Sequence, residues 1–512
     1  MKKTILILVV ILLMSFMLGN TVLSAFAAGK AKSGGILRIN MGRAATIIGN
    51  PLKIRGASNE YASIPLEGLL QFDPKNPGKL IPMLATSWKL ASDKSNYTLN
   101  LRRGVKFHDG TTFNAQAVKW NLGKWLESKS PIFKDMSSVD VIDEHTVRIN
   151  LSRWNNLILY NLESFGTYMI SPTAYEKNGE EWVNYNPVGT GPFKLVDFKR
   201  SVSLTFEKFK DYYKEGVPLL DGLHISQIVD PMTAMASLKR GDIDVWGSVD
   251  QVSASELAKE DKWNIDIAEG PGFFLTYNSV DSDSPFYKQE VRAAVEYAID
   301  RDRIAELSGR GFRKGVRTLL LGLDYKKAGT TPREYNPEKA KQLLKKAGYP
   351  NGFKVKLYFQ SPNERDSATA FQSYLNAIGV EAELEPVAGA GWYGKANAPL
   401  KSGEMLYGWL RPSPSSLKAA NANAVKGAWA LLQMLKRPDG LDGILDQAFS
   451  EPDLGNAMGH LHRAEKLAYD FAMFCPVLFR YAIAVKAPYV KDAIYGYGFI
   501  PRFNLEQAWL DK

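Results

Sequence analysis

The sequence predicts an α/β protein with more than one domain, and three observations support this expectation. The chain has 512 residues, which at about 150 residues per domain suggests about three domains or a two-lobed body. Its hydrophobic fraction of 45% is ordinary for a soluble globular protein and excludes wholesale disorder. From Gly35 onward, strand-like and helix-like segments alternate, without a repeat of fixed period.

The N-terminus has the pattern of a secretory signal peptide. Lys2 and Lys3 precede an almost purely apolar run over 5–18, and Ala25-Phe26-Ala27 has the small residues of a cleavage site. The run is shorter than the ~20 residues that span a bilayer, so we expect cleavage after Ala27 rather than a membrane anchor. No cysteine follows the run, which predicts an exported, periplasmic protein without a lipid anchor.

The strands that follow are predicted by apolar residues in alternation, which is typical of half-buried strands. The alternating sets are Tyr97, Leu99 and Leu101; Val147, Ile149 and Leu151; and Val202, Leu204 and Phe206.

Helices are predicted by apolar residues at helical spacing between capping and stopping residues. Asp230-Pro231 begins one helix that Gly241 stops, and Asn336-Pro337 begins another that ends before Gly348. A third is predicted over 291–299. Asn114 is expected to cap a helix after the turn at Gly110.

Sequence motifs of catalysis are missing. The chain contains no G-x-S-x-G, H-E-x-x-H or G-x-x-x-x-G-K-[ST] motif. His460 and His462 stand two apart in a helical pattern, so they are expected on the surface of a helix rather than at a metal. Cys475 lies in the apolar run 471–479 and is expected to be a buried, unreactive thiol. We therefore expect no enzyme, no metal and no cofactor.

The net charge of +10 comes from 64 basic and 54 acidic residues spread along the chain. A short basic patch, Arg310, Arg313, Lys314 and Arg317, is interpreted as a solvated loop. An exported protein rarely meets nucleic acid, so no nucleic-acid partner is expected.

The stretch from Pro82 to Trp120 contains the most informative motifs. It contains P-M-L-A-T-S-W, then Y-T-L-N-L-R-R-G-V-K-F-H-D-G, then N-A-Q-A-V. This resembles the extracellular solute-binding proteins of family 5, the peptide- and nickel-type receptors of ABC importers. Further matching blocks follow in order: Asn186-Pro-Val-Gly-Thr-Gly-Pro-Phe193, Pro218-Leu-Leu-Asp221, Leu238-Lys-Arg-Gly-Asp-Ile-Asp-Val245, Val291-Arg-Ala-Ala-Val-Glu-Tyr-Ala-Ile-Asp300 and Asn336-Pro-Glu-Lys-Ala.

The resemblance implies a two-lobed periplasmic-binding-protein-like fold of type II, with an inserted subdomain in lobe one. The implied segments are 1–27 signal peptide, 28–57 start of lobe one, 58–180 inserted subdomain, 181–275 lobe one, 276–480 lobe two and 481–512 return to lobe one. The two crossings between lobes are expected near 274–278 and 482–485. Ligand would lie between the lobes, which close on it and present a surface to a membrane permease.

Family motifs for the ligand are only partly conserved in this chain. In peptide-binding members, an aspartate that pairs with the peptide ammonium follows a G-W segment. Here Trp409 is followed by Leu410, Arg411 and Pro412, and Pro412 takes roughly the aspartate position. Nickel receptors have an arginine in the segment that here reads Ser164-Phe-Gly-Thr-Tyr-Met169. We therefore expect a ligand that needs no free α-ammonium, and no nickel chelate.

The predicted ligand-binding residues are aromatic side chains for stacking and arginines for a carboxylate or phosphate. They are Trp409, Arg411, Trp392 and Tyr393 from lobe two, and Arg43 and Tyr168 from lobe one. Packing roles remain the alternative for the tryptophans.

The leading hypothesis is a monomeric receptor that passes a small organic ligand, peptide-like or anionic, to ABC permease subunits. The alternatives are a chemosensory or chaperone-like binding protein without transport, and a secreted hydrolase, against which the missing motifs argue.

Overall fold

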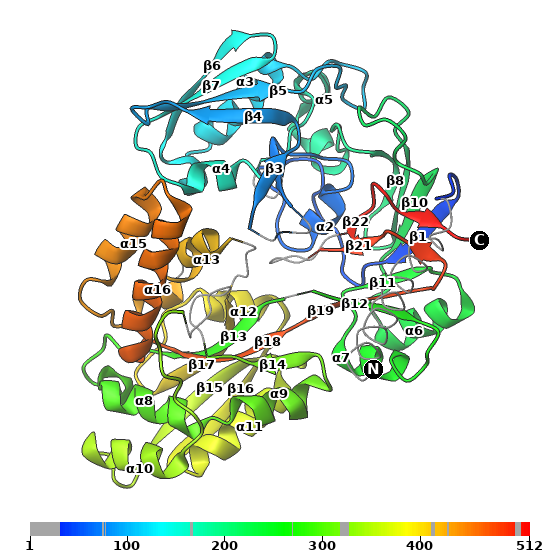
Figure 1. Ribbon diagram of the computed structural model, residues 1–512. Helices are drawn as coiled ribbons and strands as arrows, with labels where there is room; N and C mark the ends of the chain where they lie inside the picture. Colours follow the sequence, from blue (N-terminus) through cyan, green and yellow to red (C-terminus); the bar gives the residue numbers. More distant parts are fainter. Residues whose placement is uncertain are drawn as a thin grey trace, which may run out of the picture.

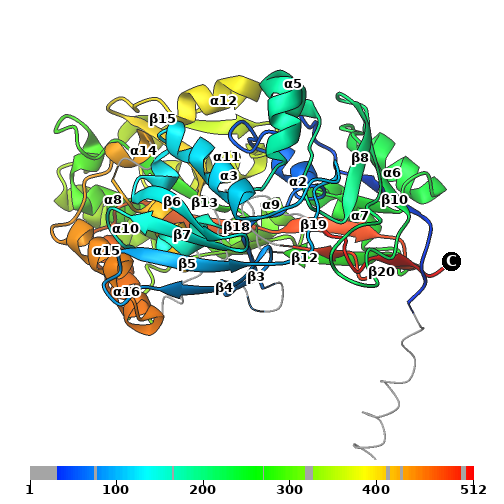
Figure 2. The same ribbon diagram turned by 90° about the horizontal axis from the view of Figure 1, so that it is seen from above.

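The structure is a computed structural model that describes residues 31–512 except 74, 75, 77, 164–166, 269, 318–326, 411–414, 427–429 and 497–502. Two sheet-centred lobes lie beside each other, and a smaller β-rich subdomain stands on the first (Figure 1). Seen from above, strands of both lobes run through the middle of the molecule with helices on either side (Figure 2). No helix of the described residues is long and apolar enough to cross a membrane.

Lobe one is built on a seven-stranded sheet whose strands come from widely separated parts of the chain. Its β1 pairs in parallel with β10 and β11, and the other pairings are antiparallel. Leu37 and Ile39 of β1 are fully buried on either side of the partly exposed Arg38, as the alternation of a strand requires. In spatial order the strands are β12 (Asn264–Ala268), β19 (Ala482–Lys486), β11 (Val245–Gly247), β1 (Ile36–Asn40), β10 (Gly222–Ser226), β9 (Ser203–Lys208) and β8 (Phe193–Lys199).

Further elements of lobe one are α2 (Ser58–Ala62), α6 (Pro231–Arg240), α7 (Gln251–Leu257), and the short strands β20 (Val490–Lys491), β21 (Ile494–Tyr495), β22 (Phe503–Asn504) and β23 (Trp509–Leu510). The helix α5 (Pro172–Tyr185) lies beside the inserted subdomain, where it contacts α3 (Ala115–Glu127) (Figure 1).

The inserted subdomain has its own four-stranded antiparallel sheet in the order β4-β5-β7-β6. Asn114 caps its main helix, with the side chain accepting a hydrogen bond from the Ala117 amide, and Gly110 has the expected positive φ of 84°. Its elements are β2 (Leu70–Phe72), β3 (Leu80–Pro82), β4 (Ala85–Leu90), β5 (Asn96–Leu101), α3 (Ala115–Glu127), β6 (Met136–Asp143), β7 (Thr146–Leu151) and α4 (Leu157–Asn161).

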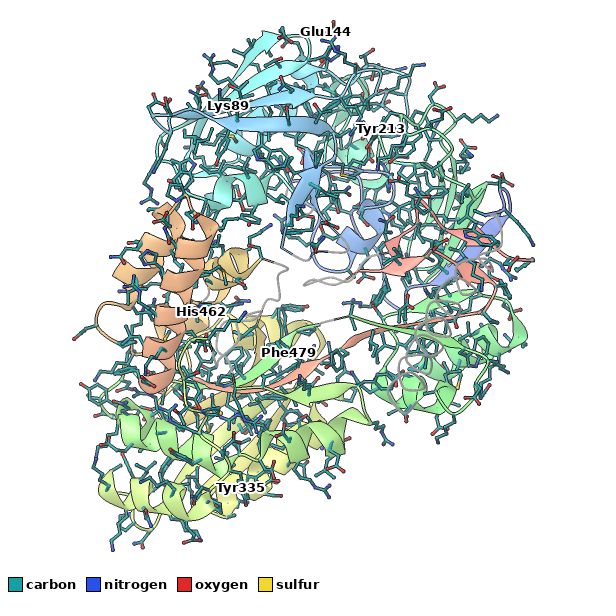
Figure 3. The ribbon with its side chains drawn as sticks, in the orientation of Figure 1. Lys89, Glu144, Tyr213, Tyr335, His462 and Phe479 are labelled. Carbon is teal, nitrogen blue, oxygen red and sulfur yellow. The ribbon has the colours of Figure 1, made fainter. Side chains whose placement is uncertain are left out.

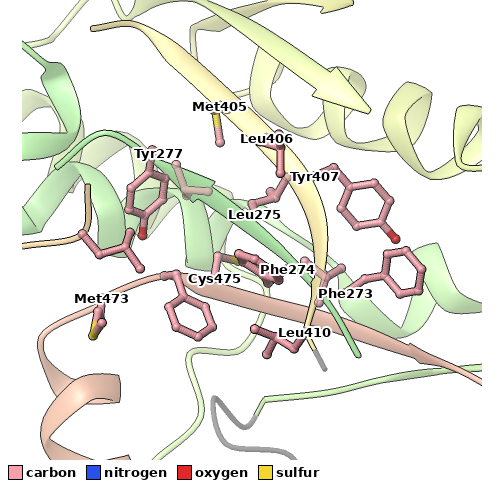
Figure 4. Packing of buried hydrophobic residues seen from close by; sticks show 14 of the residues in the cluster. Phe273, Phe274, Leu275, Tyr277, Met405, Leu406, Tyr407, Leu410, Met473 and Cys475 are labelled. Carbon is pink, nitrogen blue, oxygen red and sulfur yellow. The ribbon is translucent and has the colours of Figure 1, made fainter. Parts of the chain in front are cut away.

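Lobe two contains a six-stranded sheet in the order β14-β18-β13-β17-β15-β16 and the largest apolar core. Figure 4 shows this core around β13, with Phe273 and Tyr407 close together and Cys475 among apolar side chains. The strands are β13 (Gly272–Tyr277), β14 (Arg313–Gly315), β15 (Phe353–Ser361), β16 (Val380–Ala388), β17 (Glu404–Leu410) and β18 (Cys475–Arg480). The helices are α8 (Gln289–Ala298), α9 (Arg301–Gly309), α10 (Pro337–Lys346), α11 (Arg365–Asn376), α12 (Gly389–Ala396), α13 (Ser416–Asn423), α14 (Ala430–Gln433), α15 (Leu441–Ser450) and α16 (Leu454–Asp470).

The chain passes between the lobes at two adjacent places. It leaves the lobe-one sheet after β12 and enters the lobe-two sheet at β13, and it returns between β18 and β19, which only Tyr481 separates. The two crossings touch: a Cβ at Gly270 would lie 2.2 Å from the carbonyl oxygen of Arg480. Only glycine fits such an approach, so we call residues 270–272 and 480–482 the hinge.

A second contact joins the inserted subdomain to lobe two, away from the hinge. The Asn156 side chain, just before α4, donates hydrogen bonds to the carbonyls of Ala448 and Glu451 at the end of α15. Lys418 of α13 donates to the Tyr160 carbonyl of α4.

The predicted elements form where the patterns place them, with small shifts at the ends. The alternating sets lie in β5, β7 and β9, except that Val202 precedes β9 and is 61% exposed, and the three predicted helices are α6, α8 and α10. Cys475 is buried, as expected, and His460 and His462 both lie on α16. The interpretation of the basic patch as a solvated loop is wrong for Arg313, which is 8% exposed, because β14 pairs it into the lobe-two sheet.

Candidate inter-lobe binding site

Three neighbouring strands of the lobe-two sheet meet at the hinge: β13 begins there, and β17 and β18 end there. Gly272 of β13 pairs with Phe479 of β18 and with Leu410 of β17, and the next residue, Phe273, pairs with Trp409. Figure 3 labels Phe479 of β18, on the lobe-two side of the region between the lobes. Cross-strand partners share one face of a sheet, so Trp409 and Phe273 lie on the same face.

An ion cluster that we call the hinge triad, Arg313–Glu364–Arg480, lies at this end of the sheet. Arg313 Nη1 is 2.9 Å from Glu364 Oε2, and Arg480 Nη1 donates to Glu364 Oε1 at 3.2 Å. Arg313 and Arg480 are direct cross-strand partners, and such like-charged pairs are unfavourable unless a counter-charge offsets them. The single carboxylate of Glu364 is that counter-charge, so the triad retains one excess positive charge.

The two arginines of the hinge triad differ in their surroundings. The Arg313 side chain is 2% exposed and also donates to the Ser367 hydroxyl at 2.7 Å. The Arg480 side chain is 31% exposed, and within the described part of the chain Glu364 is its sole hydrogen-bond acceptor. Its guanidinium lies over the Phe273 ring, 5.3 Å from the centroid. Arg480 therefore has donors that can reach a ligand.

Lobe one contributes a guanidinium from the segment after β1. Arg43 Nη2 forms an ion pair of 2.6 Å with Glu60 and donates to the Ser248 hydroxyl at 3.2 Å, while its side chain stays 48% exposed. The Tyr61 hydroxyl donates to the Arg43 carbonyl and holds the backbone in place. Burial raises the pKa of the Glu60 carboxyl to about 7, against the opposing effect of Arg43.

The exposed arginines of the two lobes differ in the direction of their pKa shifts. Desolvation chiefly lowers the pKa of Arg480, Glu364 opposes this effect, and the positive charges of Arg313 and Arg43 add to it. The Tyr393 hydroxyl of α12 is near enough to contribute to the raised pKa of Arg43, which Glu60 chiefly causes. Arg43 and Arg480 are thus partly exposed guanidiniums on different lobes, and we take the region between the lobes next to them as the candidate inter-lobe site.

The predicted binding residues differ in their accessibility to a ligand. Arg43 is partly exposed on lobe one, Trp409 lies at the hinge end of β17 and Tyr393 is 58% exposed on α12, and their binding roles stay predictions. Trp392 is instead a core residue: its side chain is 1% exposed and packs in the lobe-two core. Tyr168 is likewise buried, at 2% exposure, in an apolar cluster of lobe one. Both rings are taken by packing, which corrects their prediction as stacking residues.

Arg411 and Pro412 lie outside the described residues. The expected binding of a carboxylate or phosphate by Arg411 therefore stays a prediction. The described residues contain no group of three or more histidine, cysteine, aspartate or glutamate side chains that could hold a metal.

The sequence reasoning missed Arg480, Glu364 and Glu60. Arg480 directly follows the apolar run 471–479 and precedes the predicted crossing. A charged residue at the end of a predicted buried strand, next to a crossing between lobes, was therefore a signal that could have marked Arg480 as a candidate. No comparable signal marks Glu364 or Glu60, because each carboxylate meets its arginine only through tertiary folding.

Comparison with known proteins identifies the family. The bacterial extracellular solute-binding proteins, family 5 middle region, match residues 79–422. The glutathione-binding protein GsiB of Pectobacterium atrosepticum is 31% identical over 417 residues, which cover 78% of this chain and 78% of that protein.

Solved structures agree in fold. NikA from Brucella suis, in complex with Fe(III)-EDTA, has a TM-score of 0.83 at 22% identity and covers 92% of this chain and 99% of its own. The binding protein AgaA from A. tumefacien R10, in complex with agropinic acid, has a TM-score of 0.76 at 25% identity over 93% of this chain and 99% of its own.

Proposed function

Since this chain belongs to the bacterial extracellular solute-binding proteins of family 5, the ligand receptors of ABC importers, we propose that its solute is a small peptide-like molecule with at least one carboxylate. Glutathione is our first candidate, because the 31% identical relative is named for binding it. The likeness to a complex with agropinic acid is in keeping with an acidic ligand.

The observation that carries this proposal is the charge of the inter-lobe site. Arg43, Arg313 and Arg480 supply three positive charges, and Glu60 and Glu364 supply at most two negative ones. Guanidinium groups bind carboxylates through paired, charge-assisted hydrogen bonds. Arg43 and Arg480 are the two arginines of this set with exposed side chains, so they would contact the acid group, with Trp409 and Tyr393 beside the rest of the ligand.

The remaining features of the proposal follow from the sequence patterns. The protein is exported through a signal peptide that is cleaved after Ala27, carries no lipid anchor, acts as a monomer and only binds, without catalysing a reaction. The segments 28–57, 58–180, 181–275, 276–480 and 481–512 form the parts of the two lobes, with the first crossing moved from 275 to 270–272, where β13 enters the lobe-two sheet.

Ligand identification tests the proposal. The purified mature protein is denatured, the released compound is identified by mass spectrometry, and binding is measured by calorimetry. We expect glutathione to bind, its diethyl ester to bind at least tenfold more weakly because both carboxylates are blocked, and N-acetylglutathione to retain affinity. Recovery of a neutral compound, or equal affinity for the acid and the ester, would refute the acidic class.

A further inference from the structure

The inserted subdomain contacts lobe two through the short helix α4, on the side of the molecule away from the hinge strands β12 and β19 (Figure 1). The two faces of α4 pack against different bodies. Ile158 and Leu162, four positions apart, belong to the core of the inserted subdomain. Leu157 and Tyr160, three positions apart, are buried in the lobe-two core instead. Residues at these spacings share one face of a helix, so α4 buries one face in each body.

The end of α15 in lobe two receives hydrogen-bond donors from the inserted subdomain. The last carbonyls of a helix have no partner within the helix, and those of Ala448 and Phe449 are of this kind. Asn156, just before α4, donates its backbone N–H to the Phe449 carbonyl at 2.9 Å. Its side-chain amide donates to the carbonyls of Ala448 at 2.7 Å and Glu451 at 3.2 Å. A residue of one body therefore caps a helix of the other.

Lobe two provides the same kind of contact in return. Lys418 of α13 donates from Nζ to the Tyr160 carbonyl, near the end of α4, at 3.0 Å. Its Nζ also lies 3.9 Å from the Glu163 carboxylate. Lysine side chains commonly bind the free carbonyls at the C-terminal end of a helix. Each body thus supplies a donor for a helix end of the other.

A buried carboxylate holds the inserted subdomain to lobe one. Glu67 is 1% exposed and accepts hydrogen bonds from the hydroxyls of Thr190 at 2.7 Å, Tyr212 at 2.9 Å and Tyr213 at 3.1 Å. The three donors all belong to the lobe-one segment 181–275. Because these bonds tie the inserted subdomain to lobe one, a contact at α4 acts on the angle between lobe one and lobe two.

One atom of the α4 contact favours its separation. Asn156 Oδ1 is buried without a hydrogen-bond partner in the part of the chain that the structure describes. A buried acceptor without a partner is less stable than a hydrated one. Separation of α4 from α15 would hydrate Oδ1, while the amide of Asn156 and the ammonium of Lys418 would exchange carbonyls for water. The contact therefore combines bonds that favour closure with a cost that favours opening, as a reversible contact requires.

We propose that Asn156, α4, Lys418 and the end of α15 form a latch that stabilises the closed arrangement of the lobes, so that the inserted subdomain sets how slowly a bound solute leaves. Asn156 and Lys418 act here as positioning residues, and their effect is independent of which solute binds. The latch must separate before the lobes can open. Its bonds should therefore slow the release of a ligand more than they change its capture.

The test measures the distance between the inserted subdomain and lobe two. Dyes are attached through Glu144→Cys in the inserted subdomain and Lys354→Cys in lobe two, whose native side chains are 70% and 82% exposed. The native Cys475 is fully buried and does not compete for the label. Energy transfer is recorded for N156A and for K418M, which weaken the latch from opposite sides.

N121A is the matched control. The Asn121 side chain is buried and donates to the carbonyls of Ala117 and Ile170, each at 2.9 Å, as that of Asn156 donates to two carbonyls. Both partners of Asn121 lie within the inserted subdomain. The substitution therefore removes the same kind of buried amide without touching the latch.

We expect N156A and K418M each to lower the population at the short distance severalfold, and N121A to keep the distribution of the parent protein. The double variant should lower it further than either single one. Since the two substitutions lie in different bodies, a folding defect in one body leaves the other variant informative. Identical distributions for the parent protein, N156A and K418M, or an equal shift in N121A, would overturn the latch.

Glutathione as the probe separates the latch from the proposed function. If glutathione binds, it should leave N156A and K418M about tenfold faster than the parent protein and N121A, with little change in the association rate. If it binds none of these proteins, glutathione fails as the candidate solute, and the distance measurement decides on the latch. Equal dissociation rates in all four proteins would refute the latch.

Discussion

Lobe two contains two triads in which one glutamate is shared by two arginines. The hinge triad is Arg313–Glu364–Arg480, and the second, which we call the core triad, is Arg301–Glu296–Arg333. Both carry one excess positive charge, and both glutamates are nearly inaccessible to solvent. The same set of charged groups therefore occurs twice within one lobe.

The difference lies in the remaining hydrogen-bond donors. Arg301 donates to the carbonyls of Pro476, Glu296 and Arg333, and Arg333 donates to those of Tyr469 and Asp470. Protein carbonyls thus satisfy the core triad. Arg480, by contrast, has Glu364 as its single hydrogen-bonding partner within the described ranges, and its side chain is 31% exposed. Identical charges stabilise the fold where their donors are satisfied and can bind a ligand where they are not.

Removal of one arginine from each triad should separate these roles most strongly. We expect R301A to lower the free energy of unfolding by about 3–5 kcal/mol, since it leaves buried carbonyls and Glu296 poorly compensated. R480Q should cost about 1 kcal/mol or less, because Arg480 is partly exposed and Arg313 remains on Glu364. Urea denaturation measures both, and equal losses would erase the distinction between the triads.

Strain at the hinge should disturb the hinge triad without changing any charge. In G270A the new Cβ would lie 2.2 Å from the Arg480 carbonyl, so the two crossings must separate. We expect a loss of about 1–3 kcal/mol of stability and weaker binding of glutathione. G394A is the control, because a Cβ there meets open space in α12, and it should be neutral or slightly stabilising. Normal binding by G270A would show that Arg480 does not depend on the hinge.

The pH dependence of ligand binding should come from Glu60, the lobe-one carboxylate that pairs with Arg43. Burial raises the pKa of Glu60 to about 7, and the groups around it are Arg43, Tyr61, Ser248 and Tyr495. Glu60 is therefore mostly ionised at pH 8 and mostly protonated at pH 6. Its protonation frees Arg43, and a ligand carboxyl, with an ordinary pKa near 3.5, keeps its charge throughout.

We expect the affinity for glutathione to rise severalfold as the pH falls from 8 to 6, and E60Q to lose this dependence.

The stability of the fold should also depend on the protonation of Glu60. An acid whose pKa is raised on folding binds more protons in the folded state, so the free energy of unfolding falls as the pH rises from about 4.5 to 7. A pH profile of affinity that E60Q leaves unaltered would exclude Glu60.

The smallest expected effect is on the thiol beside the core triad. Cys475 Sγ lies 3.7 Å from Arg301 Nη2, and burial raises the pKa of the thiol to about 12. A thiol reagent such as DTNB should leave the native protein and R480Q unmodified and modify R301A measurably faster. Equal rates in R301A and R480Q would show that the core triad does not protect the thiol.

Local patterns predicted much of the fold because each depends on neighbouring residues. The cap at Asn114, the turn glycine at Gly110 and the proline that begins α6 require nothing beyond a few positions of sequence. The predicted site was less complete. Aromatic residue type could not distinguish the partly buried Trp409 and the exposed Tyr393 from Trp392 and Tyr168, whose rings fill cores.

The sequence by itself determined the alternation of strands and helices, the buried state of Cys475 and the family, since periodicity, composition and ordered motifs are properties of short segments. Only the tertiary structure decided that Arg313 is buried and that it shares Glu364 with Arg480. Residues 313, 364 and 480 are far apart in the chain. Their charges interact only because folding brings these distant segments together, and no local sequence pattern encodes that contact.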